Sequence, residues 1–261
     1  MTVLREFCGD ILRATAFLSR LPVPARFFEG HDGRMGGLAG AFALSGLLLS
    51  LPAALLAALL IAGDAPPLLS ALLVLSLQTL VTGALHEDGF ADCADGLGGG
   101  RDRDRALAIM KDSRIGAYGV IALVLGFGLR ASAFSALMDV ATPLFVALAF
   151  LLAQAVSRAA MAWHWQALPS ARPGGVADSA GLPEHGSVLV CIGTALLAAL
   201  VFVVLDLPLL PVVVAVLLAG VVTAGFSRFV RRKIGGHTGD TIGATQQLAE
   251  MAVLVALALM A

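Results

Sequence analysis

The chain has 261 residues, of which 59% are hydrophobic and only 13% charged, and its formal net charge is −1. A soluble domain carries about twice that share of charge, so the composition argues against an ordinary soluble protein and favours an integral membrane protein. The sequence shows no basic and aromatic pattern typical of nucleic-acid binding. Its three scattered cysteines are too few for a disulfide framework or a zinc site.

The first 34 residues form a polar N-terminal segment. Charges occur throughout 1–34, so no signal peptide is expected there. Within this segment Phe7, Ile11, Leu12 and Leu18 fall near one face of a short helix. Such a face fits either an interfacial membrane anchor or an ordinary helix packed on the rest of the protein.

Seven later stretches are long and apolar enough to cross a hydrocarbon core of roughly 30 Å, which takes about 20 residues. The sequence therefore predicts an all-α fold, a polytopic membrane helical bundle with about seven transmembrane helices, in a single integral membrane catalytic domain covering 1–261. The predicted spans are approximately 36–62, 66–86, 117–138, 142–166, 187–205, 208–227 and 245–261.

Basic residues are distributed unevenly between the loops. If the N-terminus lies inside, the short outside loops at 63–65, 139–141 and 206–207 contain no Lys or Arg. The positive-inside rule therefore predicts a cytoplasmic N-terminus in a bacterial inner (cytoplasmic) membrane. The long polar segments 87–116 and 228–244 then lie inside, which is typical of an enzyme with its active site facing the cytoplasm.

The segment 87–116 contains an acidic motif. The preceding span is expected to continue as a helix through Asp95 and to break at the glycine-rich residues 96–100. Asp88, Asp92 and Asp95 are spaced i, i+4, i+7 and share one face of that helix. Oxygen ligands without cysteine or histidine favour Mg²⁺, so the motif predicts a magnesium site. The alternative is a solvated acidic helix end.

Cationic residues follow the acidic motif. Lys111 and Arg114 flank Asp112 and Ser113, and Arg101 precedes them. Beside a metal site, such a cluster is expected to bind a phosphate or diphosphate. Taken alone, it would equally suit contact with anionic membrane lipid.

The polar segment before the last span reads GGHTGD at 235–240. Its glycines permit a tight hairpin, and Asp240 or Thr241 is expected to cap the last helix. His237 and Thr238 are candidate substrate-binding residues within it.

Three ionisable residues lie within predicted spans. An acid such as Glu250 usually faces the bundle interior or an aqueous cleft, and Arg158 is its expected partner. For Arg130, snorkelling or a structural role is expected.

Four motifs together resemble the cobalamin synthase (adenosylcobinamide-GDP ribazoletransferase) family. They read FLSRLPVP at 17–24, GALHEDGFADCADG at 83–96, IMKDSRIGAYG at 109–119 and GGHTGD at 235–240. Their order follows the family, they span most of the chain, and the two central ones are long and specific. The chain departs from the family pattern near 246–247, where two glutamines stand in place of an expected acid.

The resemblance implies a transferase that joins GDP-activated (adenosyl)cobinamide to α-ribazole or its 5′-phosphate and releases GMP, with Mg²⁺ as cofactor. These are the last steps of cobalamin nucleotide-loop assembly. Asp88, Asp92 and Asp95 are the expected metal ligands, and Asp95 is the expected base for the ribazole hydroxyl. The remaining expected site residues are His86, Asp112 and Asp240 as catalytic groups and Arg101, Lys111, Ser113, Arg114, Arg158, His237 and Thr238 as substrate-binding groups.

Two other functions fit the sequence less well. A CDP-alcohol phosphotransferase also uses an acidic helix and Mg²⁺, but its pattern requires Asp-Gly-x-x-Ala-Arg. Here the segment 88–92 reads DGFAD, which is one residue shorter and has Asp92 where the arginine belongs. A divalent-cation transporter would need acids in two or more spans near the midplane, and Glu250 alone does not supply them.

Overall fold

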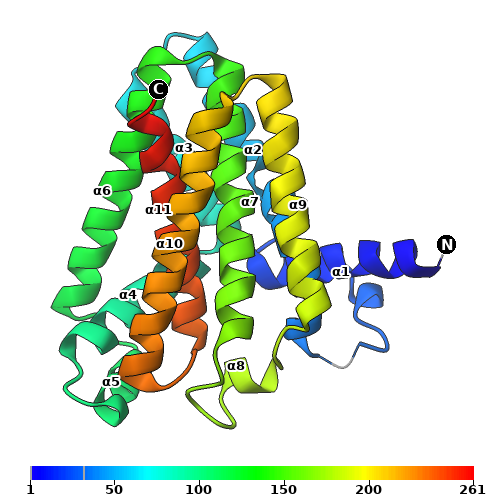
Figure 1. Cartoon of the computed structure of the whole chain (residues 1–261), viewed down its shortest axis with the longest axis vertical. Helices are drawn as coiled ribbons and strands as arrows, with labels where there is room; N and C mark the ends of the chain where they lie inside the picture. The colour runs from blue at the N-terminus through cyan, green and yellow to red at the C-terminus, as the bar shows by residue number, and fades with distance from the viewer. Residues whose placement is uncertain (1, 32) are drawn as a thin grey trace.

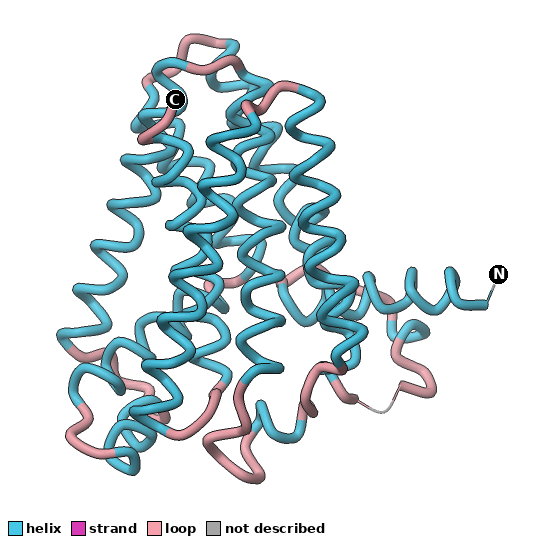
Figure 2. Tube along the Cα trace, viewed as in Figure 1, coloured by secondary structure: helices cyan, strands magenta, loops and turns pink. Residues whose placement is uncertain are grey.

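The computed structural model describes residues 2–31 and 33–261. In this part of the chain the regular structure is helical and no strand occurs (Figure 2). The elements are α1 (Thr2–Leu18), η1 (Ala25–Phe27), η2 (Met35–Ala41), α2 (Phe42–Ala62), α3 (Pro67–Thr82), α4 (Leu85–Gly99), α5 (Arg103–Met110), α6 (Ala117–Val140), α7 (Pro143–Ala167), α8 (Val176–Ser179), α9 (His185–Leu205), α10 (Leu209–Ile234) and α11 (Gly239–Ala258).

The predicted all-α membrane bundle is confirmed. Within the described residues, six helices are long and apolar enough to cross a membrane: η2 with α2, then α6, α7, α9, α10 and α11. The pair α3 and α4 makes a seventh crossing if it is counted as one broken span, with a bend of 92° between the two helices. We take α3 as the membrane-spanning part of this pair and α4 as the helix that follows the span, because α4 contains the acidic motif.

The bundle is organised around α7 and α11, which are mostly buried, while the other long helices surround them (Figure 1). In the core, the rings of Phe134 and Phe150 lie 5.3 Å apart. The surrounding helices expose large apolar side chains such as Leu55, Val124 and Leu217. Outward-facing leucine and valine are expected where lipid rather than water is the solvent.

Helix α1 extends sideways from the bundle (Figure 1). Its C-terminal end packs on the bundle, because Ala14 and Leu18 are buried. The hydroxyl of Ser45 on α2 also donates a hydrogen bond to the carbonyl of Ile11, at 3.1 Å. The helix predicted in the N-terminal segment is therefore present and contacts the rest of the protein through one end.

The junction between α3 and α4 differs from the expected continuous helix. The chain turns at Gly83 and Ala84, with φ of 65° and 58°. In this left-handed region a helix cannot continue, so the break comes before the acidic motif. The predicted end of the helix within 96–100 is confirmed, since α4 ends at Gly99. Gly96 still lies within α4, where an added Cβ would sit 2.4 Å from Met110. That glycine serves close helix packing, not chain flexibility.

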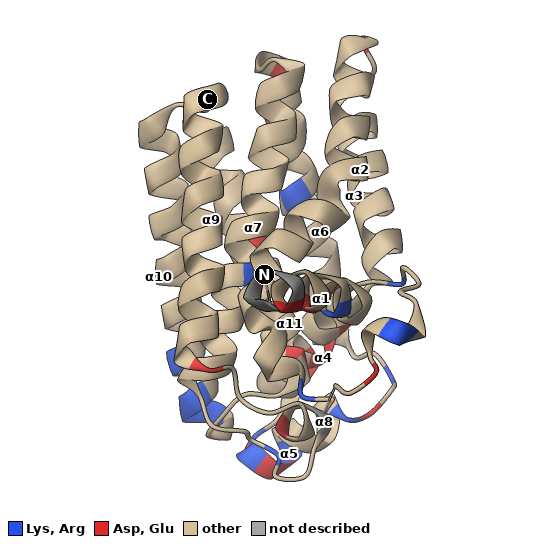
Figure 3. Cartoon of the chain, turned by 90° about the vertical axis from the view of Figure 1, so that its right-hand side faces the viewer, with Lys and Arg blue, Asp and Glu red and all other residues tan. Residues whose placement is uncertain are grey.

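Charged side chains gather at one end of the bundle, around α4, α5 and α8 (Figure 3). The short turns at the opposite end contain Asp64, Asp139 and Asp206 and no Lys or Arg. The polar loops that the sequence assigned to one side of the membrane thus do lie together at one end.

Candidate active site

A cavity of about 340 Å³ opens at the charged end, between α4, α7, α11 and the segment that follows α7. We call it the site cavity. The predicted residues that line it come from two motifs more than 140 positions apart: His86, Asp88, His237, Thr238 and Asp240.

Helices α4 and α11 approach closely because each has a glycine that faces the backbone of the other helix. A Cβ added to Gly89 would lie 3.0 Å from the Asp240 carbonyl oxygen. One at Gly243 would lie 3.4 Å from the Cα of His86. This close contact brings Asp240 to the same cavity wall as Asp88.

Asp92 is the third carboxylate near this wall. Partial burial, followed by repulsion from Asp88 and Asp240, raises the pKa of Asp92 to about 6. The three carboxylates therefore repel one another. Across residues 2–31 and 33–261, however, no three His, Cys, Asp or Glu side chains converge closely enough as they stand to cage a metal ion.

Asp95 lies on the same face of α4 about two turns beyond Asp88, and there it is buried against the start of α6. Its two carboxylate oxygens accept hydrogen bonds from the backbone amides of Gly116, at 2.7 Å, and Gly119, at 2.9 Å. A Cβ at either glycine would collide with this carboxylate. Asp95 therefore holds the N-terminus of α6 and does not line the site cavity.

The GGHTGD hairpin is joined to the segment after α7 by a parallel bridge between Ser170 and His237. The His237 amide donates to the Pro169 carbonyl at 2.8 Å, and its Nδ1 lies 2.9 Å from the Leu168 carbonyl. Burial lowers the pKa of His237, so the ring is neutral, with Nδ1–H donating and Nε2 left to accept. Nε2 has no partner among the described residues.

The N-cap of α11 is Thr238, not Asp240 or Thr241 as expected. The Thr238 hydroxyl accepts from the Thr241 amide, and the Thr241 hydroxyl accepts from the Thr238 amide. This reciprocal capping satisfies two backbone donors. The Asp240 carboxylate takes no part in the cap, and among the described residues it accepts only from the Thr238 hydroxyl, at 3.2 Å.

Two arginines near the carboxylates had not been predicted as site residues. Arg172 lines the site cavity and also donates to the Leu107 carbonyl. Arg20 lines a second cavity of about 480 Å³, together with Ser19, Thr82 and Asp88. Asp88 borders both cavities, so an acidic group lies between two cationic ones. The family motif at 17–24 was a signal for Arg20, whereas nothing in the sequence around Arg172 distinguished it.

The cationic residues predicted after the acidic motif lie outside both cavities. Asp112 is ion-paired with Arg114 at 2.7 Å. Hydrogen bonds from Arg114 lower the pKa of Asp112 to about 2, so this carboxylate stays ionised at neutral pH and is unsuited to donate a proton. Three more of the residues predicted to bind substrate are exposed at the surface: Arg101, Lys111 and Ser113.

Behind the acidic motif lies a buried ionic network between α4, α6 and α11. Arg130 Nη1 is 3.3 Å from Glu87 Oε1 and 3.5 Å from Glu250 Oε1, and all three side chains are almost fully buried. The expected pairing of Glu250 with Arg158 is wrong, because the partner is Arg130. Arg158, also buried, donates instead to Gln154 and Ser157.

Two glutamines complete this network. Gln246 Nε2 donates to Glu250 at 2.6 Å, and Gln247 Nε2 donates to Glu87 at 3.2 Å. Gln246 Nε2 also donates to Ser157, at 3.1 Å, and Ser157 accepts from Arg158, which connects Arg158 to the network. With Arg158 included, the group contains two arginines and two glutamates and is formally neutral. An acid at 246 or 247 would add an uncompensated charge to it, which explains why amides fit these positions here. Since Glu87 precedes Asp88, the network fixes the helix turn that presents Asp88 to the cavity.

Comparisons with known proteins agree with the motifs. The family model for cobalamin-5-phosphate synthase matches residues 10–258. A protein of Rhizobium meliloti (strain 1021) is 55% identical over 99% of both chains, and one of Brucella anthropi is 43% identical over 95% of this chain and 96% of its own. Both relatives are named adenosylcobinamide-GDP ribazoletransferase. No solved structure matches. The chain therefore belongs to the cobalamin-5-phosphate synthase family.

Proposed function

We propose that this chain is a magnesium-dependent transferase that joins GDP-activated (adenosyl)cobinamide to α-ribazole or its 5′-phosphate and releases GMP. Full-length similarity to adenosylcobinamide-GDP ribazoletransferases supports the reaction. The observation that carries it in the structure is the position of Asp88, between a cavity that contains Arg172 and one that contains Arg20. Two adjoining cavities that share Asp88 suit a reaction between two substrates.

The residues at the cavity wall fit magnesium. Mg²⁺ is usually held by one or two carboxylates and completes its shell with water and substrate phosphates, so a closed cage of three protein ligands is not required. We propose Asp88, Asp92 and Asp240 as the groups that hold it, with Asp240 in place of Asp95. The raised pKa of Asp92 supports this set, because a cation would relieve the repulsion that contributes to the shift. Magnesium, when bound, would neutralise diphosphate charge as GMP departs.

The chain's own residues supply the other requirements. Arg172 and Arg20 offer guanidinium groups to phosphate oxygens from two sides. His237 is held through Nδ1 by the Leu168 carbonyl, so its Nε2 is the proposed acceptor of the proton from the ribazole hydroxyl. That oxygen forms a new bond to phosphorus while the bond between phosphorus and GMP breaks.

Purified protein supplied with GDP-cobinamide, α-ribazole and Mg²⁺ is expected to release GMP. The variant His237→Asn keeps a side-chain donor near the Leu168 carbonyl but lacks the Nε2 acceptor, so its turnover is expected to fall by about 10²-fold or more. The measurement is GMP release at saturating substrate, with folding checked by thermal unfolding. Absence of GMP release by the unmodified protein would contradict the proposed function, whereas normal turnover of His237→Asn would remove only the assignment of the base.

We also propose that the charged end of the bundle faces the cytoplasm of a bacterial cell, in the inner membrane. The support is the absence of Lys and Arg from the turns at the opposite end, at 63–65, 139–141 and 206–207. A reporter fused after Asp206 is expected to read as external, and one inserted at Arg101 as cytoplasmic. The opposite pair of readings would reverse the proposed orientation.

A further inference from the structure

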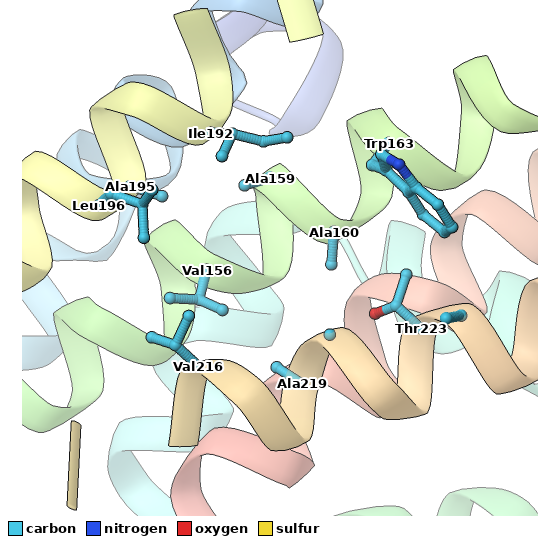
Figure 4. Close-up of a pocket in the computed structure, with 12 residues that line it drawn as sticks. Val156, Ala159, Ala160, Trp163, Ile192, Ala195, Leu196, Val216, Ala219 and Thr223 are labelled. Atoms are coloured by element: carbon cyan, nitrogen blue, oxygen red, sulfur yellow. The ribbon is translucent and has the colours of Figure 1, made fainter. Parts of the chain in front are cut away.

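On the side of the bundle away from α4, helices α7, α9 and α10 enclose a groove of about 270 Å³ (Figure 4). Helix α7 forms its floor, and α9 and α10 stand apart on either side of it, with few contacts between them. The walls are small or aliphatic residues such as Ala159, Ala195 and Gly220. Apolar walls of this kind do not hold water, so the groove suits an apolar occupant.

One polar group interrupts these apolar walls. Thr223 lines the groove and is only 3% exposed. Its Oγ1 has no hydrogen-bond partner among the residues that the structure describes, and Figure 4 shows this oxygen beside the apolar side chains of the groove. A buried hydroxyl without a partner is unfavourable. An occupant that accepts a hydrogen bond from this hydroxyl would remove the cost of burying it without a partner.

A cationic side chain lies on α10 beyond the groove, toward the charged end of the bundle. On α10, Gly220, Ala224 and Arg231 are spaced i, i+4 and i+11 and so share one helical face. Arg231 is exposed, and no hydrogen bond or ion pair of its side chain occurs in the described part of the chain. It lies eight residues beyond Thr223, about 12 Å along the axis. Because Cα–Cβ bonds in a helix tilt toward its N-terminus, the Arg231 side chain leaves the backbone in the direction of Thr223.

We propose that this groove binds an anionic glycerophospholipid from the surrounding membrane. One acyl chain lies along the apolar walls, an ester carbonyl accepts the hydrogen bond of the Thr223 hydroxyl, and the phosphate lies near Arg231. The order of these three features along α10 matches the order of chain, ester and phosphate in a lipid. The anionic class follows from the local charge, since Arg228, Arg231, Arg232 and Lys233 occur together with no acid before Asp240.

The test is native mass spectrometry of the full chain in detergent after exchange with phosphatidylglycerol or phosphatidylcholine. We expect the unmodified protein to retain phosphatidylglycerol in preference to phosphatidylcholine. Gly220→Leu fills the groove without a clash, because nothing lies within 4 Å of an added Cβ, and it should abolish retention of both lipids. Gly225→Leu is the matched control, since Gly225 has equal space but does not line the groove, and it should leave retention unchanged.

Two further variants test the polar contacts separately. Thr223→Val keeps the shape of the side chain and removes the hydrogen-bond donor, so it should lower the retention of both lipids by a similar factor. Arg231→Gln should lower retention of phosphatidylglycerol alone, by about fivefold, while Arg232→Gln, about 100° further round the helix, should not. Equal retention by the unmodified protein and Gly220→Leu would overturn the proposal, as would the absence of any preference for the anionic lipid.

Discussion

Replacing Asp88 with asparagine is expected to lower the rate of GMP release by about 10²–10³-fold while the protein still folds. Asp88 borders both cavities and is exposed to them, so the amide preserves the shape and removes a charged ligand. The apparent affinity for Mg²⁺ should fall together with turnover. Magnesium titrations followed by GMP release at saturating Mg²⁺ measure both effects.

Two aspartates serve as controls for this result. Asp104→Asn changes an exposed carboxylate on α5 and should alter neither quantity. Asp95→Asn should retain magnesium affinity but reduce the free energy of unfolding by about 1–3 kcal/mol, because an amide cannot replace both acceptors for α6. In the unmodified protein, magnesium affinity should fall as pH drops through about 6, where Asp92 becomes protonated. Near-normal activity of Asp88→Asn at ordinary Mg²⁺ would refute the metal site.

Removal of Arg130 is expected to have the largest effect on stability. In Arg130→Met, Glu87 and Glu250 lose their shared ion-pair partner in a buried position. Leaving a buried charge uncompensated costs about 3–5 kcal/mol, so the free energy of unfolding in detergent should fall by that amount. Activity should fall as well, because Glu87 adjoins Asp88.

A charge-balanced double variant separates this ionic effect from lost packing. Arg130→Met with Glu250→Gln removes one charge of each sign, so it should recover part of the stability that Arg130→Met loses. Both are compared by denaturant unfolding in the same detergent. If the double variant were less stable than Arg130→Met alone, charge compensation would not be the basis of the network.

The sequence was sufficient for features that depend on local composition. Apolar length determined the number and approximate limits of the spans. Spacing placed Asp88 and Asp92 on one face, and the family motif singled out the hairpin containing Asp240, which lines the same cavity as Asp88. These predictions succeeded because apolar burial and helical periodicity act over short stretches of chain.

Features that depend on distant contacts could not be predicted in this way. Asp95 has the same helical spacing as its neighbours, and only the position of α6 gives its oxygens to two backbone amides. The choice of Arg130 over Arg158 as partner for Glu250 depends on how three helices pack. Arg172 adjoins Asp240 only because the Ser170 bridge joins two segments far apart in sequence.

The bend after α3 has a consequence for the membrane itself. Helix α3 has 16 residues, which span about 24 Å, whereas the hydrocarbon layer is roughly 30 Å thick. The chain cannot lengthen this span, because it turns at Gly83. The bilayer must therefore thin beside α3, or the residues after the turn must lie below its boundary. Where the bilayer thins, its surface dips at Asp88, the start of the acidic motif, so phosphate groups in water can reach a site that a bilayer of uniform thickness would cover.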